Sequence, residues 1–412
     1  MNPVLSDQVL RPGATGVKGW LLQKAMASVP LGFRILRRFR PILRLGSTYI
    51  VTRYDDVVEV FATDTAFEVP YKANLDVITG NQPFILGMAD GPDYRAALGA
   101  MQQVVKRDDL AALAAKTEAL SQGAVTRAEG RIDVVADLVR PVTFALFSEY
   151  LGVPEPAQGR LDVWATRLFE FQFASSPKDL DLRAEVDAIA PAFRAHLDAE
   201  MARRKASATH SDDLLGRCLT LQSQGVPGYT DAEIRAAILC MIVGGPPQPP
   251  MVVPQAMEQV MRRPAVLQAA IAAARADDDA ALALIVREAM RFDPLAPGLP
   301  RMAVRDAVLA KGTGHETAIP KGATVIAGFA SAMMDDRRVP APASFDASRR
   351  PHEYILFGHS LHECFGRHIN GAILHMYLKP LLRQTNLRRA DGPDGTLTKI
   401  GIFADRLVLV YD

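Results

Sequence analysis

The residue best suited to bind a metal in this chain is Cys364, the last of only three cysteines. It lies in residues 357–366, a stretch with glycines near both ends, directly before a helix-like run over residues 368–382. Unpaired amide N–H groups and the helix dipole stabilise a thiolate at a helix N-terminus. The position therefore favours an ionised sulfur that can bind a soft metal ion.

Three interpretations of this cysteine compete. A lone cysteine is most often a small buried hydrophobic residue. A zinc site is suggested by the neighbouring His359, His362 and His368, but one cysteine among several histidines matches no structural zinc spacing. The third interpretation is a haem iron held by a cysteine thiolate.

The loop resembles the haem-binding signature of cytochromes P450, F-x-x-G-x-H-x-C-x-G. Ser360 replaces the usual second glycine, and Asn370 stands where an alanine is common. The positions that match the signature are Phe357, His362, Cys364 and Gly366.

The resemblance implies a haem b cofactor with Cys364 as the axial ligand of the iron. It places His362 on a haem propionate and Phe357 near the sulfur, and it makes Gly358 and Gly366 part of the cofactor-binding loop. Arg301 matches the arginine that reaches a propionate through a bidentate contact. Tyr94 stands where the propionate-binding histidine of the family is usual, and Leu98 stands at the position of an arginine, whose charge Arg95 is the candidate to replace.

Composition indicates an ordinary globular protein. The 412 residues are 49% hydrophobic and 23% charged. The net charge of +1 supports neither a nucleic-acid partner nor a strongly acidic one, and we expect no nucleic-acid partner. Three cysteines are too few for a disulfide framework. With no signal peptide and no uninterrupted apolar span, we expect a cytoplasmic protein without a transmembrane anchor.

The N-terminal region has an unusual charge pattern. Apolar residues 29–45 are interrupted by five arginines, Arg34, Arg37, Arg38, Arg40 and Arg44. The segment is either a solvated helix face beside a buried one or a basic amphipathic face that contacts a membrane peripherally. We expect residues 1–45 to form a surface segment of one cytochrome P450 domain over residues 1–412, with residues 1–28 wrapping the surface.

The elements expected after this segment are a strand, helices and a long connection, followed by a stretch of helices alone. Residues 47–53 have the composition of a strand, and Asp55 is placed to cap the helix after it. Residues 67–88 are expected to be a long, packed, ligand-facing connection. Asp90 is placed to cap the next helix, which has Pro92 in its first turn. Helical periodicity then continues over residues 108–208.

A central helix is predicted to begin at a capping box, Thr230 with Glu233, and to continue through apolar residues 236–243. Residues 244–250 contain four prolines, which must break or kink it because proline lacks the amide donor and clashes with the preceding turn. A second helical piece is expected to start near Pro249 or Pro250.

The resemblance gives this break a functional meaning. In ordinary cytochromes P450 the central helix carries an acid and an alcohol that deliver protons during O–O bond cleavage. Here Gly244 and Gly245 match the small pair, while Pro247 replaces the acid and Gln248 the threonine. Gln248 can donate a hydrogen bond but is a very poor acid. The resemblance makes Gly244, Gly245 and Gln248 the candidate catalytic residues; the alternative is a loop that only bends the helix.

Further motifs are consistent with the same family. The E-x-x-R pair Glu288 and Arg291 shares one helix face, and with Arg349 it would form a buried structural network. The residues that the resemblance places at the substrate pocket are Phe84, Ile85, Phe171, Val243, Leu295 and Leu299.

We therefore expect a mainly α fold with a smaller β-rich part, the cytochrome P450 fold, with its long central helix interrupted near residues 244–250. The leading hypothesis is a haem-thiolate enzyme that rearranges or uses a hydroperoxide, with a small hydrophobic or fatty-acid-derived substrate. A monooxygenase fed by ferredoxin and a reductase, with water or substrate assisting proton delivery, is the alternative. A non-catalytic haem-binding sensor or carrier is the third hypothesis.

Overall fold

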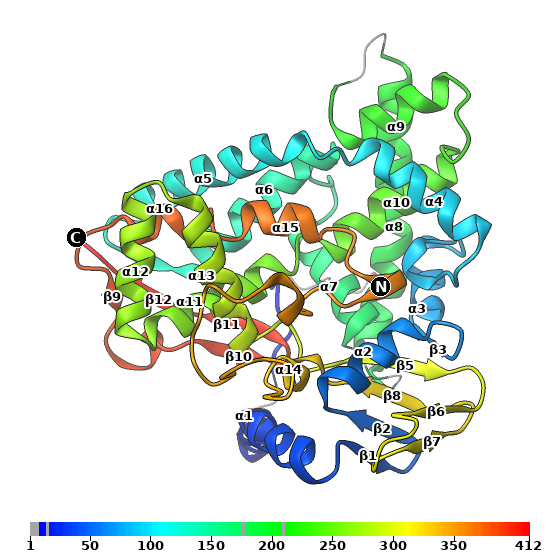
Figure 1. Cartoon of the computed structure of the whole chain (residues 1–412). Coiled ribbons are helices and arrows are strands. Elements are labelled where there is room, and N and C mark those ends of the chain that lie inside the picture. Colours follow the sequence, from blue (N-terminus) through cyan, green and yellow to red (C-terminus); the bar gives the residue numbers. More distant parts are fainter. Residues whose placement is uncertain (1–7, 14–15, 175, 177, 208–210) are drawn as a thin grey trace. The chain divides into compact units, whose positions relative to one another are not determined.

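The computed structural model describes residues 8–13, 16–174, 176, 178–207 and 211–412 (Figure 1). The chain forms two compact units, each assembled from separate segments. The helical unit consists of Met1–Arg11, Tyr71–Pro254 and His368–Asp412, and the mixed unit of Pro12–Pro70 and Gln255–Arg367. Neither unit is one continuous stretch of sequence, and the single domain over residues 1–412 stays a prediction.

Most elements of the helical unit are helices (Figure 1). Its helices are α3 (Lys72–Thr79), α4 (Pro92–Val104), α5 (Asp109–Arg127), α6 (Arg140–Leu151), α7 (Leu161–Phe173), α8 (Leu180–Lys205), α9 (Leu214–Ser223), α10 (Asp231–Gly244), α11 (Pro249–Met261, which ends in the mixed unit), α15 (Arg367–Ile373) and α16 (Lys379–Leu382). Its shorter helical turns are η1 (Ile85–Gly87), the π-helix η2 (Val134–Val139) and η5 (Gly392–Gly395). Its strands are β4 (Arg131–Asp133), β9 (Arg388–Arg389), β10 (Thr398–Ile400), β11 (Phe403–Arg406) and β12 (Val408–Val410), which form a β4-β12-β9 sheet and a β10-β11 pair.

Helix α10 packs against α3, α6, α7 and α8, so it is central to the helical unit. The predicted capping box is confirmed: the Thr230 amide donates to Glu233 at 2.9 Å, and the Glu233 amide donates to Thr230 Oγ1 at 3.3 Å. Seven side chains of the helix are buried, which explains its apolar sequence.

The predicted interruption is also confirmed. Helix α10 ends at Gly244, and α11 begins at Pro249. The amide of Gly245 still donates to the Met241 carbonyl at 2.9 Å, but Pro246 and Pro247 have no amide hydrogen with which to continue the ladder. By length and composition the whole stretch Asp231–Met261 resembles a membrane span, but 72% of its apolar window is buried inside the structure, as in a core helix.

The mixed unit is organised around a five-stranded sheet with strand order β1-β2-β8-β5-β3, drawn at the lower right of Figure 1. Strands β2 and β8 pair in parallel and the other neighbours are antiparallel. The sheet and its covering helices share one hydrophobic core that includes Val51, Phe61, Val325 and Phe329. Its strands are β1 (Ile42–Leu45), β2 (Thr48–Val51), β3 (Phe67–Glu68), β5 (Leu299–Ala303), β8 (Thr324–Ala327) and the separate pair β6 (Ala307–Leu309) and β7 (Thr317–Ile319). Its helices are α1 (Gly16–Phe39), α2 (Tyr54–Ala62), α12 (Pro264–Arg275), α13 (Asp279–Phe292) and α14 (Phe329–Ala332), with the turns η3 (Pro351–Glu353) and η4 (Ser360–His362).

Several local predictions are wrong. Residues 67–88 are not one long loop, because they contain β3, η1 and α3, which ends at the left-handed Gly80. Residues 16–28 lie in helix α1, which was not predicted from the sequence; residues 1–7 and 14–15 fall outside the described residues. Asp55 and Asp90 cap no helix, since the capping positions are occupied by Arg53 and Gly91.

Candidate active site

The Cys364 loop lies between η4 and α15 in the mixed unit. The Cys364 amide donates to the Phe357 carbonyl at 2.8 Å, which closes the loop. Gly358 and Ser360 both have positive φ angles, +78° and +61°. Glycine adopts this left-handed conformation freely, whereas serine does so at a cost. Ser360, at the position where a glycine is usual, therefore carries backbone strain.

Opposing influences act on the pKa of the Cys364 thiol. Burial is the strongest influence and leaves its pKa above the ordinary value, although a hydrogen bond from the Gly366 amide and the charge of Arg367 lower it. The prediction of an ionised sulfur is therefore wrong for the protein without a bound metal. A cationic metal ion at the sulfur would remove the proton, because the thiolate is the ligand form of cysteine.

Two side chains that can donate hydrogen bonds to an anion, Arg301 and His362, interact electrostatically in this region. Arg301 on β5 is 3% exposed, and its guanidinium donates to the Pro300 carbonyl at 3.0 Å. The pKa of His362 is lowered to about 4, first by burial and then by the charge of Arg301. A guanidinium and an imidazole that influence each other electrostatically suit an anionic group, because a carboxylate would accept hydrogen bonds from both.

Helix α2 supports both sides of this arrangement. Its residue Phe61 is completely buried, and the Arg301 guanidinium lies 4.9 Å from the centroid of its ring. The same helix packs against η4, which carries His362. A cation above an aromatic face is attracted by the ring quadrupole, so Phe61 helps to fix Arg301. Phe61 was not predicted from the sequence, because its position on α2 is typical of an ordinary core residue.

The donor set fits a haem. Cys364 supplies one soft sulfur, and Arg301 with His362 supplies donors for carboxylates, as an iron porphyrin with propionates requires. A zinc site is less well supported, because no group of three or more His, Cys, Asp and Glu side chains suited to a metal occurs in the described part of the chain. His368 instead contacts Arg107 at 2.6 Å.

The break between α10 and α11 lies in the helical unit. The Gln248 side-chain amide donates to the carbonyl of Gly244. Residues 234–257 contain no Asp, Glu, Ser, Thr, Tyr, His or Lys. The thiol of Cys240 lies within this stretch, and burial raises its pKa far above the ordinary value. Over these 24 residues the helix therefore presents no side chain that can deliver a proton near neutral pH.

A small cavity of about 10 Å³ borders the break. It is lined in part by Thr166 from α7, Pro247 and Phe403 from β11. This volume accommodates about one water molecule and no organic substrate.

Tyr94 and Arg95 occupy different environments on α4. Tyr94 is 5% exposed, whereas the side chain of Arg95 is 65% exposed and forms an ion pair with Asp90 at 2.9 Å. Binding of a propionate by Arg95 would compete with this ion pair. The roles of both residues at a propionate stay predictions.

The residues predicted for the substrate pocket belong to both units. In the helical unit, Phe84 precedes η1, Ile85 lies within it, Phe171 lies on α7, and Val243 lies near the end of α10. In the mixed unit, Leu299 on β5 packs against the hydrophobic core, and Leu295 is partly buried in the segment before β5.

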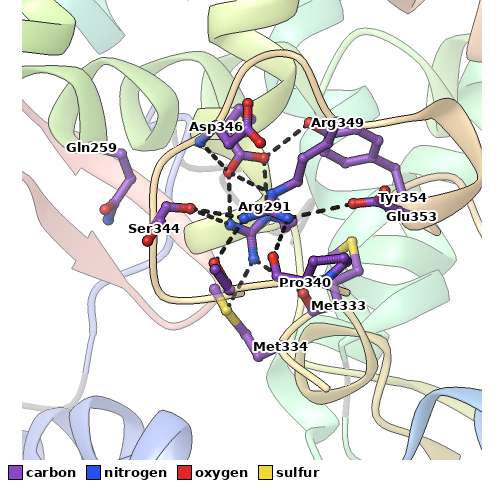
Figure 2. A network of polar contacts seen from close by, with 12 residues as sticks. Gln259, Arg291, Met333, Met334, Pro340, Ser344, Asp346, Arg349, Glu353 and Tyr354 are labelled. Carbon is purple, nitrogen blue, oxygen red and sulfur yellow. Dashed lines mark hydrogen bonds and ion pairs between the residues drawn. The ribbon is translucent and has the colours of Figure 1, made fainter. Parts of the chain in front are cut away.

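The residues of the E-x-x-R motif form a buried network (Figure 2). Glu288 and Arg291 on α13 are joined by hydrogen bonds of 2.7 and 2.9 Å. Arg349 donates to Glu288 at 3.2 Å, and Tyr354 donates to the same carboxylate at 2.9 Å. Figure 2 shows the two arginines also bound to the loop around Ser344, whose carbonyl accepts from both. The network ties α13 to the segment that leads to the Cys364 loop.

Comparison with known proteins identifies the family. The family model described as Cytochrome P450 matches residues 182–394. The chain is 26% identical over 344 residues to the cyclomarin C epoxidase CymV of Salinispora arenicola (strain CNS-205), covering 81% of this chain and 82% of that protein. It is 24% identical over 376 residues to a steroid C26-monooxygenase of Mycobacterium tuberculosis (strain ATCC 25618 / H37Rv), covering 89% and 88%.

Solved structures agree in fold. The ligand-free structure of cytochrome P450 TbtJ1 has a TM-score of 0.78 at 23% identity and covers 94% of this chain and 98% of that one. The structure of P450BioI in complex with an acyl carrier protein has a TM-score of 0.80 at 18% identity and covers 94% and 99%. The predicted fold is thus confirmed, and together with the family match over more than half of the chain it shows that the protein belongs to the cytochrome P450 family of haem-thiolate oxidoreductases.

Proposed function

We propose that this protein is an atypical cytochrome P450 that acts on a hydrophobic hydroperoxide, such as one derived from a fatty acid. It would either rearrange the hydroperoxide or transfer one of its oxygen atoms. The single observation that carries the proposal is the interrupted central helix, in which residues 234–257 offer no proton donor and Gln248 is hydrogen-bonded to Gly244.

Several residues would act around the cofactor. Cys364 would hold the haem iron, and Arg301 with His362 would bind the propionates. A haem with a thiolate ligand supplies O–O bond cleavage. The Gly366 amide donates to the sulfur, which favours the thiolate form.

The missing proton donors favour a substrate that brings its own peroxide bond. Reduction of dioxygen consumes two electrons and two protons, and the protons need a positioned donor. Isomerisation of a hydroperoxide keeps all its atoms, and its dehydration releases one water. Neither reaction needs external electrons.

The test is rapid mixing of the ferric, haem-loaded protein with a fatty-acid hydroperoxide in the absence of reductant. Hydroperoxide loss and product mass are followed, with free haem and the Cys364→Ala variant as controls. Fast conversion to an isomer or dehydrated product, beyond both controls, is expected. Oxygen transfer to a second added molecule would identify a peroxygenase. Conversion no faster than that by free haem would overturn the proposal.

A second candidate is a monooxygenase that receives electrons from a ferredoxin and a reductase. Two relatives with about a quarter of their residues identical, the cyclomarin C epoxidase CymV and the steroid C26-monooxygenase, favour it. Protons would then come from the substrate or from water, for which the cavity beside Pro247 and Thr166 has room. Product formation that requires dioxygen, ferredoxin and reductase would establish this function. Haem binding without turnover in either assay would favour a sensor or carrier.

A further inference from the structure

We infer that the second half of α1 and the hairpin after it form a docking surface for an anionic lipid membrane. The surface consists of the exposed apolar residues Leu31, Ile35, Phe39 and Leu45 and the exposed arginines Arg34, Arg38, Arg40 and Arg44. This inference is independent of the reaction proposed above.

The inward face of α1 is fixed by two contacts. The ring of Phe33 lies against Gly328, and Arg37 donates to the carbonyl and hydroxyl oxygens of Ser331 at 3.0 and 2.8 Å. Residues 33 and 37 therefore define the side of α1 that packs on α14 and on Gly328, the residue before α14.

The opposite side of the helix is apolar. At about 100° per residue, Ile35 points roughly 180° away from the mean direction of Phe33 and Arg37, with Leu31 and Phe39 on either side of it. Leu31 is 56% exposed, Ile35 is 50% exposed and Phe39 is 76% exposed. A surface helix of a globular protein normally carries polar residues on this side.

The exposed apolar residues are concentrated in this segment. Of the eight strongly exposed large apolar side chains in the described residues, four lie within residues 31–45. The fourth, Leu45, is 56% exposed in β1, the strand that follows α1 and contacts it. Figure 1 shows α1 at the edge of the mixed unit. A concentration of this kind marks an interaction surface.

The charge pattern identifies the partner. Residues 8–54 contain nine of the 47 basic residues of the chain and none of its 46 acidic ones. Arg34 and Arg38 lie one turn apart and flank the apolar stripe. No ion pair within the described residues neutralises Arg34, Arg38 or Arg40. An apolar stripe flanked by unneutralised arginines matches the boundary between acyl chains and anionic headgroups.

The first test is flotation of the haem-loaded full-length protein with vesicles. We expect binding to phosphatidylcholine vesicles that contain phosphatidylglycerol and much weaker binding to phosphatidylcholine alone. Raising the salt from about 0.1 M to 1 M shortens the Debye length from about 10 Å to 3 Å and should weaken binding. Replacing Arg34, Arg38 and Arg40 by Gln should weaken it about fivefold per arginine.

A site-specific test uses a fluorescent reporter. Phe39→Trp should show a blue shift and quenching by brominated lipid, measured against the wild-type background. Leu180→Trp is the matched control, because Leu180 is 74% exposed but lies at the start of α8. Phe39→Ser should weaken vesicle binding about tenfold or more, and Leu180→Ser should not.

Two outcomes would overturn the inference. One is the absence of vesicle binding, or binding that Phe39→Ser and the arginine substitutions leave unchanged. The other is a concentration-dependent dimer that Phe39→Ser dissociates while no vesicle binding occurs, because a second copy of the chain would then cover this surface. An unchanged haem absorption spectrum verifies that each variant is folded.

Discussion

The side-chain amide of Gln248 donates a hydrogen bond to the carbonyl oxygen of Gly244, across the break between α10 and α11. The last carbonyl groups of a helix have no partner within the helix. Gln248 therefore caps α10, at the position where the family resemblance places the proton-relaying alcohol. Gln248, which was expected to serve catalysis, therefore stabilises the end of α10.

The first prediction concerns this cap. Gln248→Leu should lower the free energy of unfolding by about 1 kcal/mol, because one carbonyl loses its donor. Hydroperoxide turnover should stay nearly unchanged, whereas loss of a general acid costs about 10²–10⁴-fold. Gln384→Leu is the matched control. Gln384 donates in the same way to the carbonyl four residues earlier, that of Pro380, but lies far from Gln248 in the sequence. A hundredfold fall in turnover for Gln248→Leu alone would show that the amide is catalytic.

The second prediction concerns the buried network of Figure 2. Arg349 is 5% exposed and donates to the carbonyl oxygens of Pro340, Ala341 and Ser344 at 2.6–3.0 Å. Arg349→Lys should destabilise the protein by about 3 kcal/mol or more, because an ammonium cannot reproduce the planar set of donors. Denaturant unfolding of the haem-loaded protein measures the loss. The exposed Arg388 provides the control, and an equal effect of Arg388→Lys would contradict a special role for the network.

The sequence predicted the elements whose signals are local. The capping box at Thr230 and the proline run both act within a few residues, so the start of α10, its end and the restart at Pro249 were all correct. Helix α3 was missed because Pro70, Gly80 and Pro83 suggested one continuous loop. The Cys364 motif was recognisable from its order of residues, but the support of Arg301 by Phe61 was not. That contact joins residues 240 positions apart, and nothing in the sequence near either residue signals it.

The third prediction concerns strain in the Cys364 loop. Ser360→Gly should raise the stability of the loop by less than about 1 kcal/mol, since relief of the left-handed strain is partly offset by the entropy of glycine. Gly358→Ala should lower it by about 1–2 kcal/mol, although no atom beyond the two adjacent residues lies closer than 3.8 Å to the added Cβ. Thermal unfolding of both variants measures the direction of each change in stability. Equal changes in the melting temperature would show that the left-handed backbone conformation does not determine the stability of this loop.

The fourth prediction tests whether Arg301 binds the cofactor. Arg301→Gln should accelerate haem transfer to apomyoglobin about tenfold or more, because a charge-assisted hydrogen bond is worth about 1.5–3 kcal/mol. Arg305→Gln is the control: Arg305 follows the same strand, is exposed, and donates to Thr65. Equal transfer rates for the two variants would contradict propionate binding by Arg301.

The fifth prediction is a pH dependence of stability at Glu200 on α8. Hydrogen bonds from Arg203 and then Arg204 lower the pKa of Glu200 to about 2, and Arg204 also holds Asp213 at 2.7 Å. Because the folded pKa lies below the ordinary value of 4.5, the stabilisation is fully present above about pH 4.5 and is lost as the pH falls toward 2. Glu200→Gln should therefore cost at most about 3 kcal/mol at pH 7, and its difference from the wild type should shrink below pH 4.5. Glu149→Gln removes an exposed ion pair with Lys116 and should change stability by less than about 1 kcal/mol. Chemical denaturation across this pH range measures both variants, and a Glu200→Gln difference that does not vary with pH would assign its effect to packing instead of charge.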